Sequence, residues 1–479
     1  MSSAPDTSIL TSLNIQHGTD LHEMKFAVTA WSKGRARVGV LQLANCPQPM
    51  ETPALLLSTR KGLPVFISPD FLPSLPSPDS HLLQMSPLHL YVFTSLPLLL
   101  FVLIVGYIVD MSMWVLRLLF LPAHAAVKMV GCTWVPGFLA YMCVYLSLDG
   151  ISSKTISNIG GLHQMLGLHE YGFAAIPRDS IVCLPECDST NKIGASFETP
   201  SGRRLIKPVE YMEMISSMKP SLWATLADEV PAWVSAKRNK ASVDRTLRWL
   251  DECITLSPAG GAVFGAIVGG ANVEERQRCA QEVAGRNVSG YWIGGFGLGE
   301  SMDERPALLN AVADILPVER PRQICGLELP EEVLQGVAAG IDLFDSTYIY
   351  HLTLGGFALT FPLESIQRHE SDSRLSDVGS DHTKINLRAT IYRKDTAPIV
   401  DNCNCYTCQN HTRAYINHLL NVHEMLAQIL LEIHNTHHYL GFFRSIRTAI
   451  KEDNFEQFRQ TFIDSRREHL NMTAVCASA

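Results

Sequence analysis

Three features are missing from this sequence, and each absence argues against a class of protein. No G-x-G-x-x-G motif follows a first strand and no G-x-x-x-x-G-K-[ST] motif occurs, which disfavours nucleotide-cofactor folds. The polar stretch Met1–Asp20 lacks the basic and apolar regions of a secretory signal. Positive charge is not in excess, because 39 Lys and Arg stand against 47 Asp and Glu, a net charge of −8. Binding of nucleic acid would therefore need a local cationic face.

The composition itself indicates a globular protein. Of the 479 residues, 47% are hydrophobic and 18% are charged, which supplies ample material for a core and excludes disordered or collagen-like chains. The 12 cysteines do not suggest a disulfide framework, since three of them are too tightly clustered for one. We therefore expect a reducing, intracellular compartment.

One segment, residues 90–149, carries much of the apolar character. Leu90–Val109 contains no charged residue and is long enough to cross a bilayer core of about 30 Å as a helix. A second apolar stretch, Met129–Leu148, follows it. Taken alone, the segment reads as one or two transmembrane helices, and the alternative is a hairpin buried in a protein core.

The middle of the chain alternates short apolar runs with helical patterns. The predicted strands are Gly261–Ile267, Ser289–Ile293, Gln323–Leu327 and Ile341–Phe344, and the predicted helices are Val273–Gly285, Met302–Leu316 and 330–340. Such alternation is typical of parallel βαβ units, found in (β/α)8 barrels and in doubly wound sheets. Because the nucleotide-cofactor motifs are absent, we predict the TIM-type barrel.

Barrel enzymes carry their chemistry just past the carboxyl ends of their strands, and two places fit that rule. Gly294 and Gly295 follow one predicted strand, where glycine lets a ligand approach the backbone closely. Asp345 follows another, where a carboxylate could act as nucleophile or base. A flexible connector and a helix cap are the alternatives, and spacing alone does not choose between them.

The strongest local motif is C-x-C-x-x-C, formed by Cys403, Cys405 and Cys408, with His434 farther along the chain. Three thiolates and one imidazole make a closed tetrahedral set, which suits one structural Zn²⁺ with no open position. A straight helix would carry His434 about 39 Å from Cys408, so the chain must fold back.

The sequence allows this return. Thr412–Leu420 is predicted as one helix, Asn421 as a turn and His423–Asn435 as a second, antiparallel helix. By periodicity alone, four other histidines compete as the fourth ligand: His418, His423, His437 and His438.

The stretch CNCYTCQNHTRAYINHLLNVHEMLAQILLEIHN resembles the zinc-binding carboxyl-terminal module of the tRNA-guanine transglycosylase family. The resemblance extends through GGFGLGE, GIDLFDS, SVDRTLRWLDECI and SNIGGLHQ, and it assigns the metal to Cys403, Cys405, Cys408 and His434. It implies four segments: 24–89 and 150–400 as two parts of one barrel, 90–149 as an apolar insert, and 401–470 as a zinc-binding helical module.

The family resemblance implies a barrel enzyme that exchanges guanine in a tRNA anticodon loop for a 7-deazaguanine, queuine in eukaryotes, using two aspartates. Asp345 matches the nucleophile, whereas Asn158 in SNIGG falls on the acid/base position, and an amide cannot take a proton at neutral pH. Val268 stands where catalytic members have a base-reading Gln. Asp228 matches a base-recognition aspartate, so Asp228 and the Gly294–Gly295 pair are remnants of a substrate pocket.

This incomplete pocket resembles the accessory, non-catalytic subunits of eukaryotic queuine tRNA-ribosyltransferases. The resemblance implies a heterodimer with a catalytic paralogue, a role in positioning tRNA, and a cytoplasmic protein that associates peripherally with the mitochondrial outer membrane. The alternative is an active transglycosylase that uses Asp345 as nucleophile with a different base. Asp345 also has a structural interpretation, because a carboxylate at a strand end can accept backbone N–H bonds.

The family-like sequence stops near His89 and resumes near Gly150, so the apolar segment interrupts a barrel. A membrane span threaded there would force one barrel to close around a bilayer-seeking insert. We therefore predict a lineage-specific insertion or a translated intron, and an integral membrane protein is the alternative.

Overall fold

The computed structural model describes residues 24–44, 46–90, 153–199, 202–257, 261–363 and 383–465. Residues 91–149 of the predicted apolar insert lie outside this part of the chain, so the interpretations of that segment stay predictions. Among the described residues, no helix combines the length and the apolar character that a membrane crossing requires.

The centre of the molecule is a closed barrel of eight strands, each hydrogen-bonded in parallel to its neighbours. Its strands are β4 (Ala54–Ser58), β5 (Leu82–Met85), β6 (Gly172–Ala175), β10 (Leu222–Ala224), β11 (Ala262–Ile267), β12 (Gly290–Ile293), β13 (Arg322–Ile324) and β14 (Leu343–Asp345). Most of their side chains are buried on both faces, which explains why the strands read as continuous apolar runs in the sequence. The predicted TIM-type barrel is confirmed.

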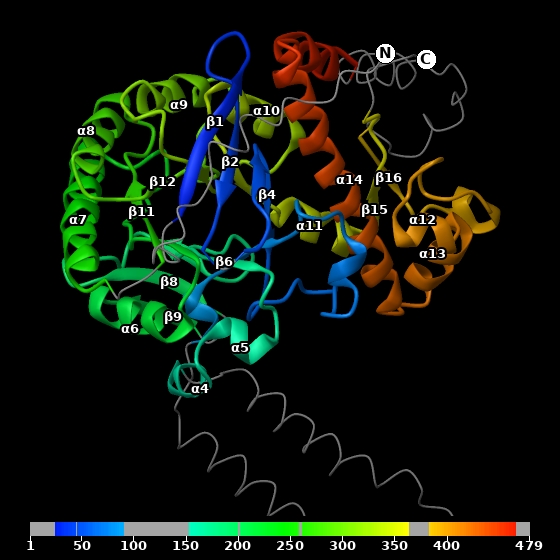
Figure 1. Ribbon diagram of the computed structural model, residues 1–479, viewed down its shortest axis with the longest axis horizontal. Coiled ribbons are helices and arrows are strands. Elements are labelled where there is room, and N and C mark those ends of the chain that lie inside the picture. Colours follow the sequence, from blue (N-terminus) through cyan, green and yellow to red (C-terminus); the bar gives the residue numbers. More distant parts are fainter. Residues whose placement is uncertain are drawn as a thin grey trace, which may run out of the picture.

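Helices surround the barrel (Figure 1). They are α6 (Pro208–Met218), α7 (Ala236–Thr255), α8 (Val273–Ala284), α9 (Arg305–Ala313), α10 (Pro330–Ala338) and α11 (Thr347–Gly355). Side-chain caps begin two of them, because Ser235 accepts a hydrogen bond from the Arg238 N–H at α7 and Asn272 accepts one from the Glu275 N–H at α8.

Strands β5 and β6 are neighbours in the barrel, paired from Leu82↔Gly172 to Met85↔Ala175. The connection between them contains η2 (Pro87–Leu90), α4 (Ser153–Ile159) and α5 (Leu162–Leu166). Residues 91–152 therefore fall within one crossover of a single barrel, between two strands that bond to each other.

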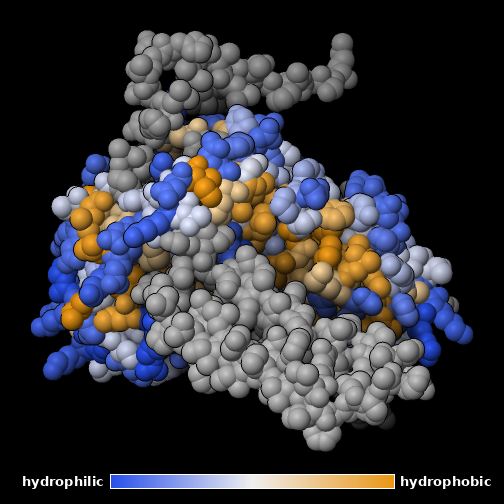
Figure 2. Space-filling model, turned by 90° about the horizontal axis from the view of Figure 1, so that it is seen from below, coloured by the Kyte–Doolittle hydropathy of each residue, from blue (hydrophilic) through white to orange (hydrophobic). Residues whose placement is uncertain are grey.

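Two antiparallel sheets accompany the barrel. The first contains β1 (Lys25–Trp31), β2 (Arg37–Gln42) and β3 (Met50–Thr52), and the second contains β7 (Leu184–Glu186), β8 (Ala195–Thr199) and β9 (Gly202–Ile206). A short η1 (Leu72–Ser74) lies between β4 and β5. Seen from below, hydrophobic residues gather in patches between hydrophilic margins of the described surface (Figure 2).

The C-terminal module has its own core. Its elements are β15 (Phe357–Leu359), β16 (Lys384–Asn386), η3 (Thr390–Lys394), α12 (Tyr406–Asn410), α13 (Arg413–Asn421) and α14 (Leu426–Lys451). Buried residues of this core lie on both sides of the boundary predicted at residues 400–401, from Ala358 and Ile385 to Leu430. The predicted first helix is confirmed as α13, whereas the second starts at Leu426 and is longer than predicted.

Helix α14 joins the module to the barrel. Its 26 residues span about 39 Å, and its first turns pack in the module core while Phe443, Ile446 and Ile450 belong to the barrel core. Near its C-terminal end, the Arg447 guanidinium pairs with Asp79 at 2.9 Å and donates to the Pro53 carbonyl. Destabilising α14 would therefore disturb both cores.

Candidate functional site

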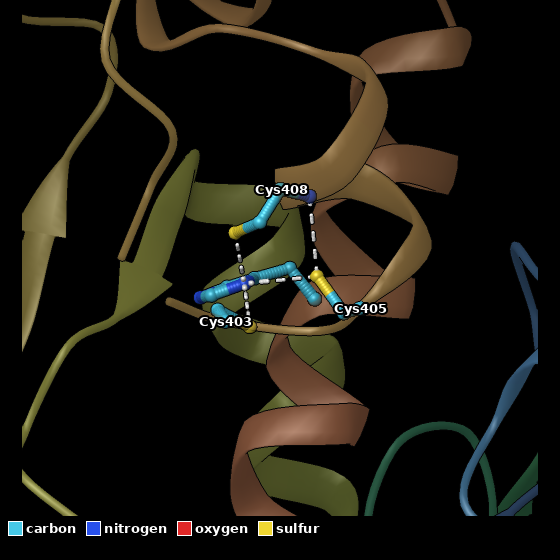
Figure 3. A group of neighbouring side chains, drawn as sticks. Cys403, Cys405 and Cys408 are labelled. Carbon is cyan, nitrogen blue, oxygen red and sulfur yellow. Dashed lines mark hydrogen bonds between the residues drawn. The ribbon is translucent and has the colours of Figure 1, made fainter. Parts of the chain in front are cut away.

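The four predicted metal ligands meet in one cluster. Cys403 precedes α12, Cys405 is its N-cap, Cys408 lies within it, and His434 comes from α14. Figure 3 shows the three labelled cysteine side chains converging on one point. All four ligand atoms lie within 4.8 Å of one another. The fold-back that this arrangement requires is provided by α13 and the turn before α14.

The distances fit a tetrahedral ion. His434 Nδ1 lies 4.0 Å from Cys403 Sγ, 3.5 Å from Cys405 Sγ and 3.3 Å from Cys408 Sγ. With Zn–S near 2.3 Å and Zn–N near 2.05 Å, a tetrahedron places sulfur and nitrogen about 3.5 Å apart. The cluster can therefore hold a metal ion after adjustments of a few tenths of an ångström.

Neighbouring groups orient the ligands. His434 is fully buried, and its Nε2 must donate to the Leu359 carbonyl at 2.9 Å, because a carbonyl only accepts. This bond leaves Nδ1 unprotonated and free to ligate, as in other metal sites with a carbonyl behind the imidazole. The Cys408 N–H donates to Cys405 Sγ at 3.3 Å, which stabilises a thiolate there.

The four competing histidines lie outside the cluster. His418 and His423 are exposed, and His437 is half-buried. His438 is buried, its Nε2 donates to the Phe361 carbonyl at 2.8 Å, and burial lowers its pKa to about 3. Among the described residues, His434 is thus the histidine that completes the three-cysteine set.

Asp345 occupies the mouth of the barrel as the last residue of β14. It is 1% exposed, and its Oδ2 accepts a hydrogen bond from the Gly326 N–H at 3.3 Å. Burial raises its pKa to about 6, against the opposing effect of the Arg178 charge. Both predicted interpretations of Asp345 therefore keep a physical basis: a strand-end acceptor and a carboxyl group with a shifted pKa.

Arg178 and Glu229, which the sequence did not single out, fill the mouth beside Asp345. Arg178 follows β6, and its buried Nη1 donates to Glu229 Oε2 at 3.1 Å and to the Phe296 carbonyl at 2.8 Å. Glu229 Oε2 also accepts from the Gly295 N–H at 2.6 Å. Burial lowers the Arg178 pKa, but the charges of Glu229, Cys325 and Asp345 together with the Glu229 hydrogen bond outweigh burial and raise it overall, so Arg178 keeps its proton.

The carbonyls of the predicted glycine pair, Gly294 and Gly295, are hydrogen-bonded by a side chain of the protein. Arg276 is fully buried, and its guanidinium donates to the carbonyls of Gly294 at 3.2 Å and Gly295 at 3.0 Å. The same guanidinium lies 4.0 Å from the centroid of the Phe296 ring. A ligand that approached this backbone would therefore have to displace existing hydrogen bonds.

Two further residues at predicted pocket positions, Asp228 and Val268, are either paired with arginines or apolar. Both Asp228 oxygens bind arginines of α7, with Arg238 at 2.7 and 2.8 Å and Arg245 at 3.0 Å. Val268 is fully buried after β11 and presents no hydrogen-bonding side chain. Base recognition by Asp228 would compete with two guanidinium groups.

Asn158 is not brought together with Asp345. It is exposed on α4, and Gly161, three residues later, lies against the Met218 carbonyl at the C-terminal end of α6. That position is just before β10 begins, at the amino ends of the strands, opposite the mouth. The residue that the chain places beside Asp345 after β6 is Arg178.

One more carboxyl group stands near the mouth. Burial raises the pKa of Glu328 to about 8, and the neighbouring Asp345 charge adds to the shift. Two carboxyl groups with raised pKa values are thus neighbours, which is the feature that an acid/base pair would need. A raised pKa was not readable from the sequence, because it depends on burial in the folded barrel.

Comparison with known proteins identifies a family and its relatives that match most of this chain. The family model described as "Queuine tRNA-ribosyltransferase" matches residues 143–468. A human protein named "Queuine tRNA-ribosyltransferase accessory subunit 2" is 34% identical over 354 residues, covering 65% of this chain and 85% of the relative. Proteins of the same name from Xenopus tropicalis and Danio rerio are 36% and 33% identical over 83% and 80% of their lengths. This chain belongs to the queuine tRNA-ribosyltransferase family.

Proposed function

We propose that this chain is the non-catalytic subunit of a queuine tRNA-ribosyltransferase heterodimer. It would support the exchange of guanine for queuine at the wobble position of the tRNA anticodon, while a catalytic paralogue performs the reaction. The relatives named as accessory subunit 2 support this role. The alternative is an active transglycosylase that uses Asp345 with a different base, for which the neighbouring Glu328 is the candidate; it has less support, because the relatives carry the accessory name.

The observation that carries the proposal is Arg178 beside Asp345. The exchange needs a group that takes a proton from one base and returns it to the other, close to the nucleophile. Arg178 cannot do this near neutral pH, because its guanidinium stays protonated and is held by Glu229 and the Phe296 carbonyl. The buried Arg178–Glu229 ion pair occupies the space beside Asp345.

For the Cys403–His434 centre of the C-terminal module we propose one Zn²⁺ with a structural role. Three sulfurs and one imidazole nitrogen are the donor set of closed zinc sites, and they leave no position for a substrate. The ion would tie the loop before α12 to α14, and α14 enters the barrel core.

An exposed apolar surface of the C-terminal module supports the proposal that the chain binds a partner subunit. Tyr415, Val422, Met425 and Leu426, at the ends of α13 and α14, are exposed, with Met425 at 66%. Exposed apolar residues gathered on one module are typical of protein–protein interfaces. We propose that the catalytic paralogue binds there.

Arginines near the second antiparallel sheet support contact with tRNA. Arg238 and Arg245 donate to the Cys187 and Thr190 carbonyls, and Arg248 donates to Lys192. Asp228 neutralises part of the charge of Arg238 and Arg245, and Arg248 pairs with Glu252, so this face of α7 offers tRNA phosphates guanidinium hydrogen-bond donors rather than a large excess of positive charge. We propose this face as a tRNA contact.

The location of the protein is also a proposal: cytoplasmic, with peripheral association with the mitochondrial outer membrane. It rests on the family resemblance. Carbonate extraction of isolated mitochondria should release the full-length chain, whereas retention in the membrane would favour the alternative that residues 90–149 span it. Sequencing the transcript across these residues would test the translated-intron interpretation.

The decisive experiment is a base-exchange assay with labelled guanine and purified tRNA. We expect no exchange with this chain alone and exchange when the catalytic paralogue is added. In the pair, Asp345→Asn in this chain should leave the rate within about twofold, whereas replacing the paralogue's own nucleophile should abolish it. Exchange by this chain alone that disappears in Asp345→Asn would overturn the proposal.

A further inference from the structure

A second group of metal-ligating side chains lies at the carboxyl ends of β5 and β6. His89 follows β5, whereas Asp179 and Cys183 follow β6, and their ligand atoms lie within 4.8 Å of one another. All three residues are buried. The group is separate in the fold from the Cys403–His434 centre, which lies in the C-terminal module.

Asp179 and Cys183 lie opposite each other as an antiparallel pair joined by backbone hydrogen bonds. The Asp179 N–H donates to the Cys183 carbonyl at 3.1 Å, and the Cys183 N–H donates back at 3.0 Å. Residues paired in this way point their side chains to the same face. Asp179 Oδ1 also accepts from the Ile181 N–H at 2.9 Å, which fixes the turn between them.

His89 is held against this hairpin by the neighbouring strand end. Its N–H donates to the Ser86 carbonyl at 3.1 Å, and Ser86 Oγ donates to the Pro177 carbonyl at 2.9 Å. The imidazole Nε2 lies 2.6 Å from Asp179 Oδ2. The other nitrogen, Nδ1, is buried and has no hydrogen-bond partner among the described residues.

The buried imidazole, carboxylate and thiol offer three donor atoms within 4.8 Å of one another, and the unpartnered Nδ1 can carry the ring proton when Nε2 binds an ion. We propose that His89, Asp179 and Cys183 form a second site for a divalent transition-metal ion of the Zn²⁺ class. Nitrogen, oxygen and sulfur donors together suit zinc, and three protein ligands leave a fourth position for water.

Binding requires a small and chemically balanced change. The ion takes the place of the proton between His89 Nε2 and Asp179 Oδ2 and of the Cys183 thiol proton; the imidazole proton moves to Nδ1, so the ring stays neutral, and the thiol proton passes to solvent. Tetrahedral zinc separates its nitrogen and oxygen ligands by about 3.4 Å, so His89 Nε2 and Asp179 Oδ2 move apart by less than about 1 Å. The Asp179 side chain is 10% exposed, which gives the ion an edge through which to enter.

An ion bound at this site would affect the barrel mouth, because the site adjoins Arg178. Asp179 directly follows Arg178, whose side chain lies in the barrel mouth against Glu229. A metal that clamps the β5 and β6 ends to each other would fix the backbone from which Arg178 projects.

The test is the metal content of the full-length chain after equilibration with a small excess of Zn²⁺ and gel filtration. Mass spectrometry of the metal should give two zinc ions per chain in the wild type and one in Cys183→Ala and in Asp179→Asn. Cys253→Ala is the matched control, because Cys253 is an equally buried cysteine outside both clusters and should keep two ions.

Cobalt gives an independent readout. With Co²⁺ in place of Zn²⁺, Cys183→Ala should lose the sulfur-to-cobalt absorption of one thiolate and keep that of the three-cysteine centre. Asp179→Asn preserves the size of the side chain, so it reports on the site even if Cys183→Ala fails to fold. One zinc ion per wild-type chain, or two in Asp179→Asn, would overturn the proposal.

Discussion

The C-terminal metal cluster and the barrel mouth both bury several polar groups, but they neutralise them differently. At the mouth, Arg178 and Glu229 pair with each other, Glu229 also accepts from the Gly295 N–H, and Arg276 donates to the Gly295 carbonyl. In the cluster, three thiols and one imidazole face one another with no cation from the protein among them. The mouth carries its own compensating cation, whereas the cluster presents a donor set that could hold an external ion. The two regions should therefore respond differently to loss of metal and loss of charge.

Loss of a metal ligand should have the largest effect. Cys408→Ser removes one thiolate from the cluster, and structural zinc contributes on the order of 10 kcal/mol to folding. We expect loss of bound zinc, unfolding of the C-terminal module and a lower melting temperature of the whole chain, because α14 belongs to both cores. Zinc content and thermal unfolding measure this.

The matched control is Cys187→Ser. Cys187 is half-buried and belongs to neither metal-ligating cluster of the described residues, so this change should leave both readouts unaltered. A Cys408→Ser protein that melted like the wild type would show that the cluster needs no ion.

Loss of Arg178 at the mouth should have the second-largest effect on stability. Arg178→Met leaves Glu229 without its buried cation, which typically costs about 3–5 kcal/mol. Urea unfolding measures the loss.

Arg203→Met serves as the control for a lost arginine. Arg203 pairs with Glu186 at 3.4 Å, but its side chain is 57% exposed, so its loss should cost less than about 1 kcal/mol. Equal costs for Arg178→Met and Arg203→Met would contradict the idea that the mouth depends on a buried ion pair.

A third effect depends on pH. Burial raises the pKa of Asp345 from 3.8 to about 6, so between these values the folded chain holds a proton that the unfolded chain has lost. Stability from this group is therefore present at low pH and is lost as the pH rises through about 6. We expect on the order of 2 kcal/mol between pH 4 and pH 6.5.

Asp345→Asn should remove this contribution. Urea unfolding of wild type and variant across the same pH range measures this contribution together with the part of the Glu328 shift that the Asp345 charge causes, since the remaining titrating groups are shared by the two proteins. Parallel stability curves for the two would show that Asp345 does not titrate in this window.

The two regions also differ in how far they could be predicted from sequence. The residues of the C-terminal cluster were found because their spacing of one and two residues is set by coordination chemistry. Four of the eight barrel strands, β11 to β14, were found because burial on both faces makes uniform apolar runs, whereas β4, β5, β6 and β10 were not predicted. The mouth was not found, because Arg178 and Glu229 meet only when strands distant in sequence become neighbours. Asn158 was assigned to the pocket by the letters of a motif, and the fold places Arg178 there. The short β7–β9 and β15–β16 strands were missed because three to five residues carry little periodicity.

The smallest expected effect tests the assignment of the fourth ligand. His418 and His423 are neighbours of the cluster in sequence, but both side chains are exposed. His418→Ala and His423→Ala should each change the free energy of unfolding by less than about 0.5 kcal/mol, as for other surface substitutions, and leave the zinc content unchanged. His434→Ala should lose the ion, because it removes the buried nitrogen that lies 3.3–4.0 Å from all three sulfurs. Metal loss in His418→Ala or His423→Ala instead would mean that the histidine which binds the ion is not the one whose Nε2 is fixed by the Leu359 carbonyl.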